Sequence, residues 1–402
     1  KFKEINVCKF YNPSNNVLID EGLLLSFSAP NSFTGDNLVE FHIHGSNAVI
    51  SYFLKVLSEQ DNCRLAEPGE FTKIAFQNNK IDLIEAESIG DLIHSETELQ
   101  RQQAINLIQG NASNYYNNLR KKLVKSLAYV EAQIDFAEDD LPDSVLTEVQ
   151  VTIKEIYDDI EKILNDNKVG EKIRDGFRVT IVGEVNAGKS SLLNLLSKRE
   201  VAIVSEEAGT TRDVIETYLN IDGYPVILAD TAGIRESNNQ TENKGISLAL
   251  NRFKKADLNL IIIDNSSKKL DKKIQSLINE DSIIVLNKSD IEGTQKYNFK
   301  EAILVSVKEN KNIDQLVEKI KEKLSLKFIS SKSTLVTRER HRTKLNECLK
   351  EIDNFLKKDL KKDIEIAAED LRLATRHLGS IVGKVDVEEI LESIFKDFCI
   401  GK

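Results

Sequence analysis

The chain has 402 residues, of which 41% are hydrophobic and 30% are charged, and this length predicts two or three domains rather than a single core. Acidic residues outnumber basic ones by 65 to 55, so the net charge of −10 argues against a basic surface that wraps nucleic acid along the whole chain. No apolar run is long enough to cross a membrane, and four scattered cysteines without a C-x-x-C pair indicate a reducing, cytoplasmic environment.

Residues 1–80 are expected to form an α+β domain. The run 39–44 alternates apolar and polar residues, which predicts a strand, and apolar residues at helical spacing predict a helix over 47–57. His42 and His44 lie two residues apart on the predicted strand and therefore share a face. Because no third ligand is evident, packing or hydrogen bonding is favoured over a metal site for this pair.

Changes in periodicity divide the rest of the chain into three parts. Apolar residues recur at helical spacing over 81–173 and again over 329–402, which predicts a helical bundle domain built from two segments. Over 174–328, strand-like runs alternate with helical ones, a pattern typical of a parallel sheet with helices on both faces. The sequence thus predicts a multidomain α+β and α/β protein, in which an α/β domain is inserted into a helical one.

The α/β segment begins with a phosphate-binding loop. Residues 183–190 read G-E-V-N-A-G-K-S, which fits G-x-x-x-x-G-K-[ST] between a predicted strand and a predicted helix. Glycines let backbone N–H groups surround phosphate oxygens, while Lys189 is expected to bridge the terminal phosphates during catalysis and Ser190 to bind Mg²⁺. The predicted phosphate-binding residues are Asn186, Ala187, Gly188, Lys189, Ser190 and Ser191.

Two segments that follow later strands are expected to contact the base. Residues 287–290 read N-K-S-D after the predicted strand 282–286. A carboxylate in the base plane can accept hydrogen bonds from both N1–H and the N2 amine of guanine, whereas adenine offers no such donor pair, so Asp290 predicts GTP. The residues expected at the base are Asn287, Lys288 and Asp290, with Ser306, Val307 and Lys308 placed for a backbone contact to guanine O6.

Two further motifs lie between the phosphate loop and the base-binding segments. Asp230-Thr231-Ala232-Gly233 closes the predicted strand 225–229, which places a carboxylate near Mg²⁺ and a glycine amide near the γ-phosphate. Thr211, in the upstream loop, is expected to complete the Mg²⁺ shell. Four motifs in this order and spacing predict a GTPase domain at 174–328.

Hydrolysis requires a group that positions the attacking water. Ile234 follows D-x-x-G at the place where many GTPases have glutamine, and its side chain cannot hydrogen-bond to water. Arg212 and Arg235 are candidates for an arginine finger, although structural or partner contacts are favoured for both. A metal ion could equally neutralise the charge that develops on the phosphoryl oxygens.

Three segments outside the GTPase motifs carry a further pattern. They are Pro30-Asn31-Ser32-Phe33-Thr34-Gly35 with Glu40 and His44-Gly45, Pro68-Gly69-Glu70-Phe71 with Asn79-Lys80, and the terminal Phe398-Cys399-Ile400-Gly401-Lys402. With these segments the chain resembles, over nearly its whole length, the tRNA-modification GTPases called MnmE or TrmE. An N-terminal domain followed by a helical domain with an inserted GTPase domain is also the architecture of that family.

The resemblance implies how the GTPase site is completed. Asn186 would help to bind K⁺, with Ser205, Glu207 and Thr210 in the loop that wraps the ion, so that K⁺ supplies the charge of an arginine finger. Glu242 would be a catalytic residue that orients the attacking water through a second water. GTPase domains of the family are activated by dimerisation across their nucleotides, so the resemblance implies a homodimer.

The resemblance also implies a folate site in the N-terminal domain. The dimer of this domain would hold 5-formyltetrahydrofolate or a related tetrahydrofolate, with Glu40, Lys80 and Lys402 at its binding positions. Cys399 would be a nucleophile or redox thiol near the one-carbon unit. The family pattern has an arginine in an earlier Gly-rich segment that this sequence lacks, and the sequence contains no Met, so it is expected to begin inside a longer protein.

The implied activity is tRNA modification. With a flavin-dependent partner of the MnmG or GidA type, in a heterotetramer, the protein would use GTP hydrolysis and a folate one-carbon unit to form a carboxymethylaminomethyl-type group on C5 of the tRNA wobble uridine. Two alternatives stay open: a regulatory GTPase of ribosome or RNA assembly, and a structural dimerisation protein that merely binds GTP. The first should carry a basic RNA-binding module at its end, whereas this chain ends on an acidic helix, and the full set of hydrolysis motifs disfavours the second.

Overall fold

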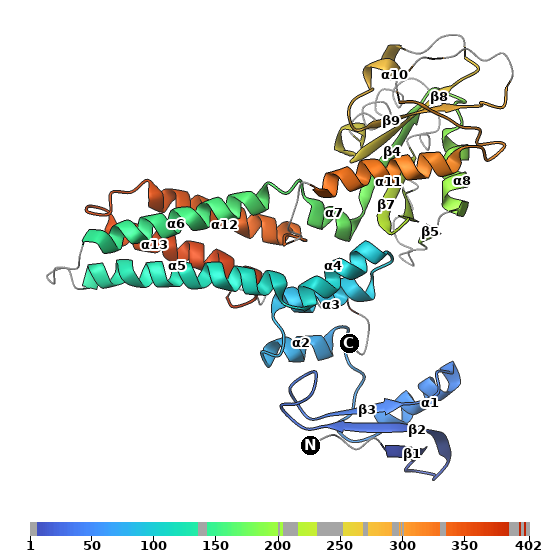
Figure 1. Cartoon of the computed structure of the whole chain (residues 1–402). Coiled ribbons are helices and arrows are strands. Elements are labelled where there is room, and N and C mark those ends of the chain that lie inside the picture. The colour runs from blue at the N-terminus through green and yellow to red at the C-terminus, as the bar shows by residue number, and fades with distance from the viewer. Residues whose placement is uncertain are drawn as a thin grey trace, which may run out of the picture. The chain divides into compact units, whose positions relative to one another are not determined.

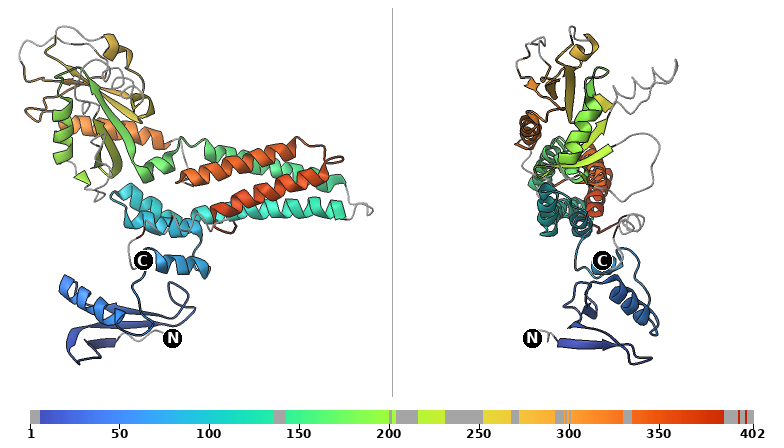
Figure 2. Two further views of the ribbon diagram at one scale, coloured as in Figure 1. Left: turned by 180° about the vertical axis from the view of Figure 1, so that it is seen from behind. Right: turned by 90° about the vertical axis from the view of Figure 1, so that its right-hand side faces the viewer.

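The computed structural model divides the chain into two compact units (Figure 1, Figure 2). The first unit comprises Lys1–Gly90, Leu107–Pro142 and Lys358–Lys402, and the second comprises Asp91–Asn106 and Asp143–Lys357. The structure describes residues 6–135, 143–199, 202–203, 216–230, 252–267, 272–291, 297, 299, 301–329, 335–385, 394 and 398.

The first unit begins with a small antiparallel sheet. Its strands, β1 (Asn6–Tyr11), β2 (Leu18–Phe27) and β3 (Leu38–His42), pair in that order, and α1 (Asn47–Ser58) packs against β2. Three phenylalanine rings from β1, β3 and α1 hold the helix to the sheet, with centroids 5.1 to 5.6 Å apart. These are Phe10, Phe41 and Phe53.

The two histidines of this region do not form one site. The predicted strand 39–44 ends at His42, so His44 lies beyond β3. His42 Nε2 lies 3.4 Å from Glu40 Oε2, while His44 Nδ1 lies 2.8 Å from Asp20 Oδ1. Each histidine thus has its own carboxylate partner, and no three His, Cys, Asp or Glu side chains gather as a metal site in the part of the chain that the structure describes.

The other regular elements described in the first unit are helices. They are α2 (Glu70–Gln77), α3 (Leu83–Ile93), α5 (Asn111–Asp135) and α13 (Ile364–Ile381), with α3 running on into the second unit. The long helices α5 and α13 lie side by side (Figure 1). Their facing positions recur at helical spacing and are buried, so the predicted helical fold is confirmed here. These positions include Leu119, Leu123, Val130, Leu371, Ala374 and Leu378.

The second unit is built on a seven-stranded sheet of order β10-β9-β8-β4-β7-β6-β5. The strands are β4 (Phe177–Gly183), β5 (Ala202–Ile203), β6 (Glu216–Ile221), β7 (Tyr224–Asp230), β8 (Leu258–Asp264), β9 (Ser282–Asn287) and β10 (Ile303–Leu304). The helices of this α/β part are α7 (Val169–Asp175), α8 (Lys189–Arg199), α10 (Lys272–Ser276) and α11 (Ile313–Ile329). Strand β8 is buried along almost its whole length, as expected for a strand covered on both faces, and the predicted α/β fold is confirmed.

One edge of this sheet corrects the expectation of a parallel sheet. Strands β10, β9, β8, β4 and β7 run parallel, but β6 is antiparallel to β7, and β5 is antiparallel to β6. Only Asp222 and Gly223 join β6 to β7, with φ angles of 48° and 90°. A two-residue turn of this kind can join only antiparallel strands, whereas parallel strands need a long crossover.

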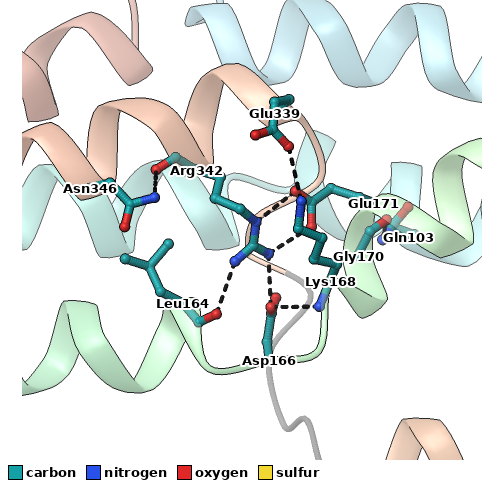
Figure 3. A network of polar contacts seen from close by, with 9 residues as sticks. All are labelled: Gln103, Leu164, Asp166, Lys168, Gly170, Glu171, Glu339, Arg342 and Asn346. Atoms are coloured by element: carbon teal, nitrogen blue, oxygen red, sulfur yellow. Dashed lines mark hydrogen bonds and ion pairs between the residues drawn. The ribbon is translucent and has the colours of Figure 1, made fainter. Parts of the chain in front are cut away.

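Three further helices belong wholly or mostly to the second unit: α4 (Glu98–Ile108), α6 (Asp143–Leu164) and α12 (Glu339–Leu356). Near these helices, Asp91 at the end of α3 binds arginines at the two points where the chain enters and leaves the α/β part. Asp91 Oδ1 accepts from Arg174 Nε at 2.9 Å and from Arg338 Nη2 at 2.7 Å. Beside them, Arg342 of α12 binds Glu171 and Asp166 in a buried network (Figure 3).

Candidate nucleotide-binding site

The phosphate loop joins β4 to α8 at the carboxyl edge of the parallel strands. Asn186 and Gly188 take left-handed conformations, with φ angles of 62° and 97°, so the backbone turns back on itself before the helix begins. Such turns at a helix N-terminus form concave anion sites lined by N–H groups. The Lys189 ammonium donates to the carbonyl oxygens of Gly183 at 3.0 Å and Glu184 at 2.7 Å, so it spans the same loop.

Asn287, the last residue of β9, joins the phosphate loop to the base-binding segment. Its Nδ2 donates to the Ala187 carbonyl at 2.8 Å, and its Oδ1 accepts from the Val307 amide at 3.1 Å. The fit to the loop is close, because a Cβ on Gly188 would lie only 2.3 Å from Asn287 Nδ2. Three segments that are distant in sequence therefore meet around one buried amide.

Asp290 is held by a residue of the next predicted segment. Its Oδ1 accepts a hydrogen bond from Ser306 Oγ at 2.7 Å, and Ser306 Oγ accepts from the Glu309 amide at 3.1 Å. The Ser306 bond is the main cause that lowers the pKa of Asp290 below its ordinary value, with nearby Lys308 and Lys288 adding to the effect. The Asp290 carboxylate is therefore ionised at neutral pH, and the bond from Ser306 fixes its orientation. Ser306, expected to offer its backbone to the base, acts here through its hydroxyl.

Lys288 has a partner that sequence reasoning missed. Its Nζ donates to Asp264 Oδ2 at 2.5 Å, and Asp264 Oδ1 also accepts from the Ser266 amide at 2.9 Å. Burial raises the pKa of Asp264, but the bonds from Lys288 and Ser266 outweigh this effect and lower it. Asp264 is the last residue of β8 and lies beside Asn287 in the register of β8 and β9. A carboxylate at the carboxyl end of a parallel strand is the sequence feature that could have marked it as a site residue.

The remaining predicted GTPase residues are described only in part. Asp230 ends β7, and its backbone lies in register with Ile181 of β4, the strand that leads into the phosphate loop. The other positions lie outside the described residues: Ser205, Glu207, Thr210, Thr211, Arg212, Thr231, Ala232, Gly233, Ile234, Arg235 and Glu242.

Two of the predicted folate-binding residues, Glu40 and Lys80, are described, and each contacts a different part of the N-terminal domain. Glu40 lies on β3 beside His42, whereas Lys80 follows α2 and donates from Nζ to the Pro30 carbonyl at 2.9 Å. Asn78 Nδ2 donates to the Thr34 carbonyl at 2.8 Å, so this end of α2 holds the loop between β2 and β3. Cys399 and Lys402 lie outside the described residues.

Sequence comparisons place these observations among known proteins. A family described as the MnmE helical domain matches residues 83–399, and one described as the GTP-binding protein TrmE N-terminus matches residues 1–80. Within the described part of the chain, no helix is both long and apolar enough to cross a membrane.

Individual relatives cover nearly the whole chain. A tRNA modification GTPase MnmE of Pelagibacter ubique (strain HTCC1062) is 57% identical over 388 residues, which span 96% of this chain and 88% of the relative. A tRNA modification GTPase MnmE of Rickettsia bellii (strain RML369-C) is 44% identical over 401 residues, which span 98% of this chain and 89% of the relative. Among solved structures, a point variant of Aquifex aeolicus Era bound to GDP.AlF4- is 30% identical, with a TM-score of 0.29, over 36% of this chain and 56% of that one.

Proposed function

Because the chain belongs to the MnmE family of tRNA modification GTPases and is a GTP hydrolase, we propose that it binds GTP at the Asn287 junction and uses hydrolysis to modify C5 of the tRNA wobble uridine. The observation that supports this most is the pair of bonds by which Asn287 joins the phosphate loop to the segment beside Asp290. Family membership sets aside the two alternatives, a ribosome-assembly GTPase and a non-catalytic GTP-binding protein.

Selection of guanine would depend on Asp290. Its ionised carboxylate, held by Ser306 Oγ, can accept from N1–H and from the N2 amine of guanine. Adenine presents no matching donors and would leave a carboxylate desolvated without partners, which is costly. The Val307 amide, already bonded to Asn287, fixes the backbone of the segment that would approach guanine O6.

The phosphates would be held by the loop backbone and by Lys189. The ammonium of Lys189 would exchange its two carbonyl acceptors, on Gly183 and Glu184, for the β- and γ-phosphate oxygens of the nucleotide. Ser190, with Thr211 and Asp230, would hold Mg²⁺, which when bound neutralises charge on these oxygens. The hydroxyl at the start of α8 and the left-handed loop fit this role.

We further propose that K⁺ and dimerisation of the GTPase domains complete the hydrolysis site. Asn186 and the loop residues Ser205, Glu207 and Thr210 would hold K⁺, and Glu242 would orient the attacking water. The test is the rate of GTP hydrolysis in KCl against NaCl at equal ionic strength, with Asn186→Ala beside wild type. We expect faster turnover in KCl for wild type only. Equal wild-type rates in the two salts would remove the K⁺ proposal.

The tRNA reaction would require a flavin-dependent partner of the MnmG or GidA type and a folate-derived one-carbon unit. The direct test is nucleoside mass spectrometry of tRNA from cells that lack this protein. Those cells should lose the carboxymethylaminomethyl-type wobble uridine and regain it with the wild-type gene but not with Lys189→Ala. Unchanged tRNA in the deletion strain would overturn the proposed function.

The folate proposal has its own test. Glu40, Lys80, Lys402 and Cys399 are the proposed contributors, and binding of 5-formyltetrahydrofolate can be followed by titration calorimetry. Glu40→Gln should weaken binding at least about tenfold, because it removes a charged acceptor for the pterin donors. Glu21→Gln is a matched control, since Glu21 is an exposed carboxylate of the neighbouring strand that pairs with Lys9. Equal affinity in the two variants would contradict a role for Glu40.

A further inference from the structure

Most of helix α5 lies in a long stretch of sequence that has no acidic residue. The sequence from 99 to 130 contains no Asp or Glu, although acidic residues outnumber basic ones in the chain as a whole. Within this stretch α5 carries four basic residues, which are Arg120, Lys121, Lys122 and Lys125. A protein that repels RNA on average therefore has one helix whose first five turns are free of acidic side chains.

Five residues with polar side chains lie on one exposed face of this helix. We call this face the α5 stripe, and its members are Asn114, Asn118, Lys121, Lys125 and Tyr129. Their spacing of three or four residues aligns them along one side of the helix. All five are exposed, and the opposite side of α5 is buried through Leu119, Leu123 and Val130.

Within the described residues, the two lysines of the α5 stripe form no ion pair. The first acidic residue along the helix, Glu131, accepts instead from Arg372 Nη2 of α13 at 2.9 Å. A further ammonium lies beside the stripe, because Lys384 Nζ donates to Asn117 Oδ1 at 2.7 Å. The Lys125 ammonium lies 5.7 Å from the centre of the Tyr129 ring, so the stripe ends on a paired cation and aromatic group.

We propose that the α5 stripe binds the phosphate and ribose backbone of tRNA, an inference that rests on the proposed function. Lysine contacts phosphate, asparagine amides contact phosphate and ribose hydroxyls, and an exposed tyrosine can stack on an unpaired base. An acidic protein partner fits less well, because protein interfaces are depleted in lysine at their centres and rely on apolar or aromatic anchors. The stripe has its only aromatic group at one end.

The test is tRNA binding by the full chain at several KCl concentrations around 0.1 M, measured by fluorescence anisotropy. Loss of two phosphate contacts in Lys121→Glu/Lys125→Glu should weaken binding at least about tenfold and reduce the salt slope by about 1.5. The matched control is Lys154→Glu/Lys162→Glu on α6, which makes the same charge change at two exposed lysines with acidic neighbours. Lys121→Arg/Lys125→Arg should retain wild-type binding.

GTP hydrolysis and thermal unfolding of the Glu variant should match wild type, because both side chains are exposed and neither forms an ion pair in the described structure. An equal loss of tRNA affinity in the α5 and α6 Glu variants would show a general charge effect and overturn the proposal. So would wild-type tRNA affinity in the α5 variant, or a loss of binding to the flavin-dependent partner instead of tRNA. Failure of the proposed function is distinguished in cells, where wild type would then not restore the modified uridine.

Discussion

Replacement of Arg342 by methionine should loosen the attachment of α12 to α7. The guanidinium donates to Glu171 Oε1 at 2.7 Å and Oε2 at 2.6 Å, to Asp166 Oδ1 at 2.8 Å and to the Leu164 carbonyl at 2.9 Å (Figure 3). Burial lowers the pKa of Arg342, but the bonds to Glu171 and Asp166 outweigh this and raise it, so the group stays charged. All three charged side chains are at most 10% exposed.

The expected cost follows from what the substitution leaves behind. Arg342→Met retains most of the aliphatic packing but leaves the Glu171 and Asp166 carboxylates buried without their cation, and about 3 to 5 kcal/mol is typical for breaking a buried ion pair in this way. A loss of about 3 kcal/mol in local stability corresponds to roughly hundredfold faster amide exchange. Because the chain has several domains, local hydrogen exchange is more informative than a single unfolding midpoint.

The assay is hydrogen-exchange mass spectrometry on peptides from α7 and α12. Lys350→Met serves as the control, since Lys350 lies on the same helix with a 75% exposed side chain and only a distant carboxylate at 3.7 Å. The double variant Arg342→Met/Glu171→Met should recover part of the lost protection, because it removes one of the two buried carboxylates that lose their cation, while Asp166 keeps its charge. Unchanged exchange in Arg342→Met, or a double variant worse than the sum of its singles, would refute this reasoning.

Three further predictions concern the nucleotide site and the cysteines. Gly188→Ala should weaken GTP binding at least about tenfold by calorimetry, because the added Cβ strains a left-handed residue and meets Asn287 Nδ2 at 2.3 Å; wild-type affinity would contradict the close contact. Asp290→Asn should lower GTP affinity about a hundredfold or more and raise xanthosine triphosphate affinity, since the amide can donate to the xanthine O2; unchanged preference would exclude Asp290 from base reading. Burial raises the pKa of Cys348 above the unfolded thiol value of about 8.5, so its contribution to stability should decrease as pH rises past that value. Iodoacetamide at pH 8 should accordingly label exposed Cys63 and leave Cys348 unlabelled until the chain unfolds, and labelling of native Cys348 would contradict its burial.

Local patterns carried most of what could be predicted about the α/β part. The runs 225–229 and 282–286 are predicted as strands, and in the structure each strand ends one residue later, at Asp230 and at Asn287. Both runs consist almost entirely of apolar residues, a local signal that a short window of sequence contains. The Asp222-Gly223 pair is also a local signal, because a two-residue connection of this kind joins only antiparallel strands, as it does between β6 and β7.

Contacts between distant segments could not be predicted in this way. Asp264 and Lys288 meet because β8 and β9 pair in one register, and a one-residue slip would have placed Asp264 elsewhere. Arg342 and Glu171 are 171 residues apart in the sequence, and no sequence pattern at either position indicates that they form a pair. Side-chain partnerships of this kind follow from the packing of elements rather than from the residues around each partner.

At the base of the inserted part, charged contacts add to the apolar packing of Val169 and Ile173 and restrict its geometry. An apolar surface tolerates sliding, because its energy depends on buried area and hardly on direction. A buried guanidinium loses its compensation as soon as one carboxylate moves away, so Arg342 favours one arrangement of α12 against α7. Asp91 imposes a second condition by binding Arg174, at the start of the α/β part, and Arg338, beyond its end. The two chain connections are thereby held together at one place.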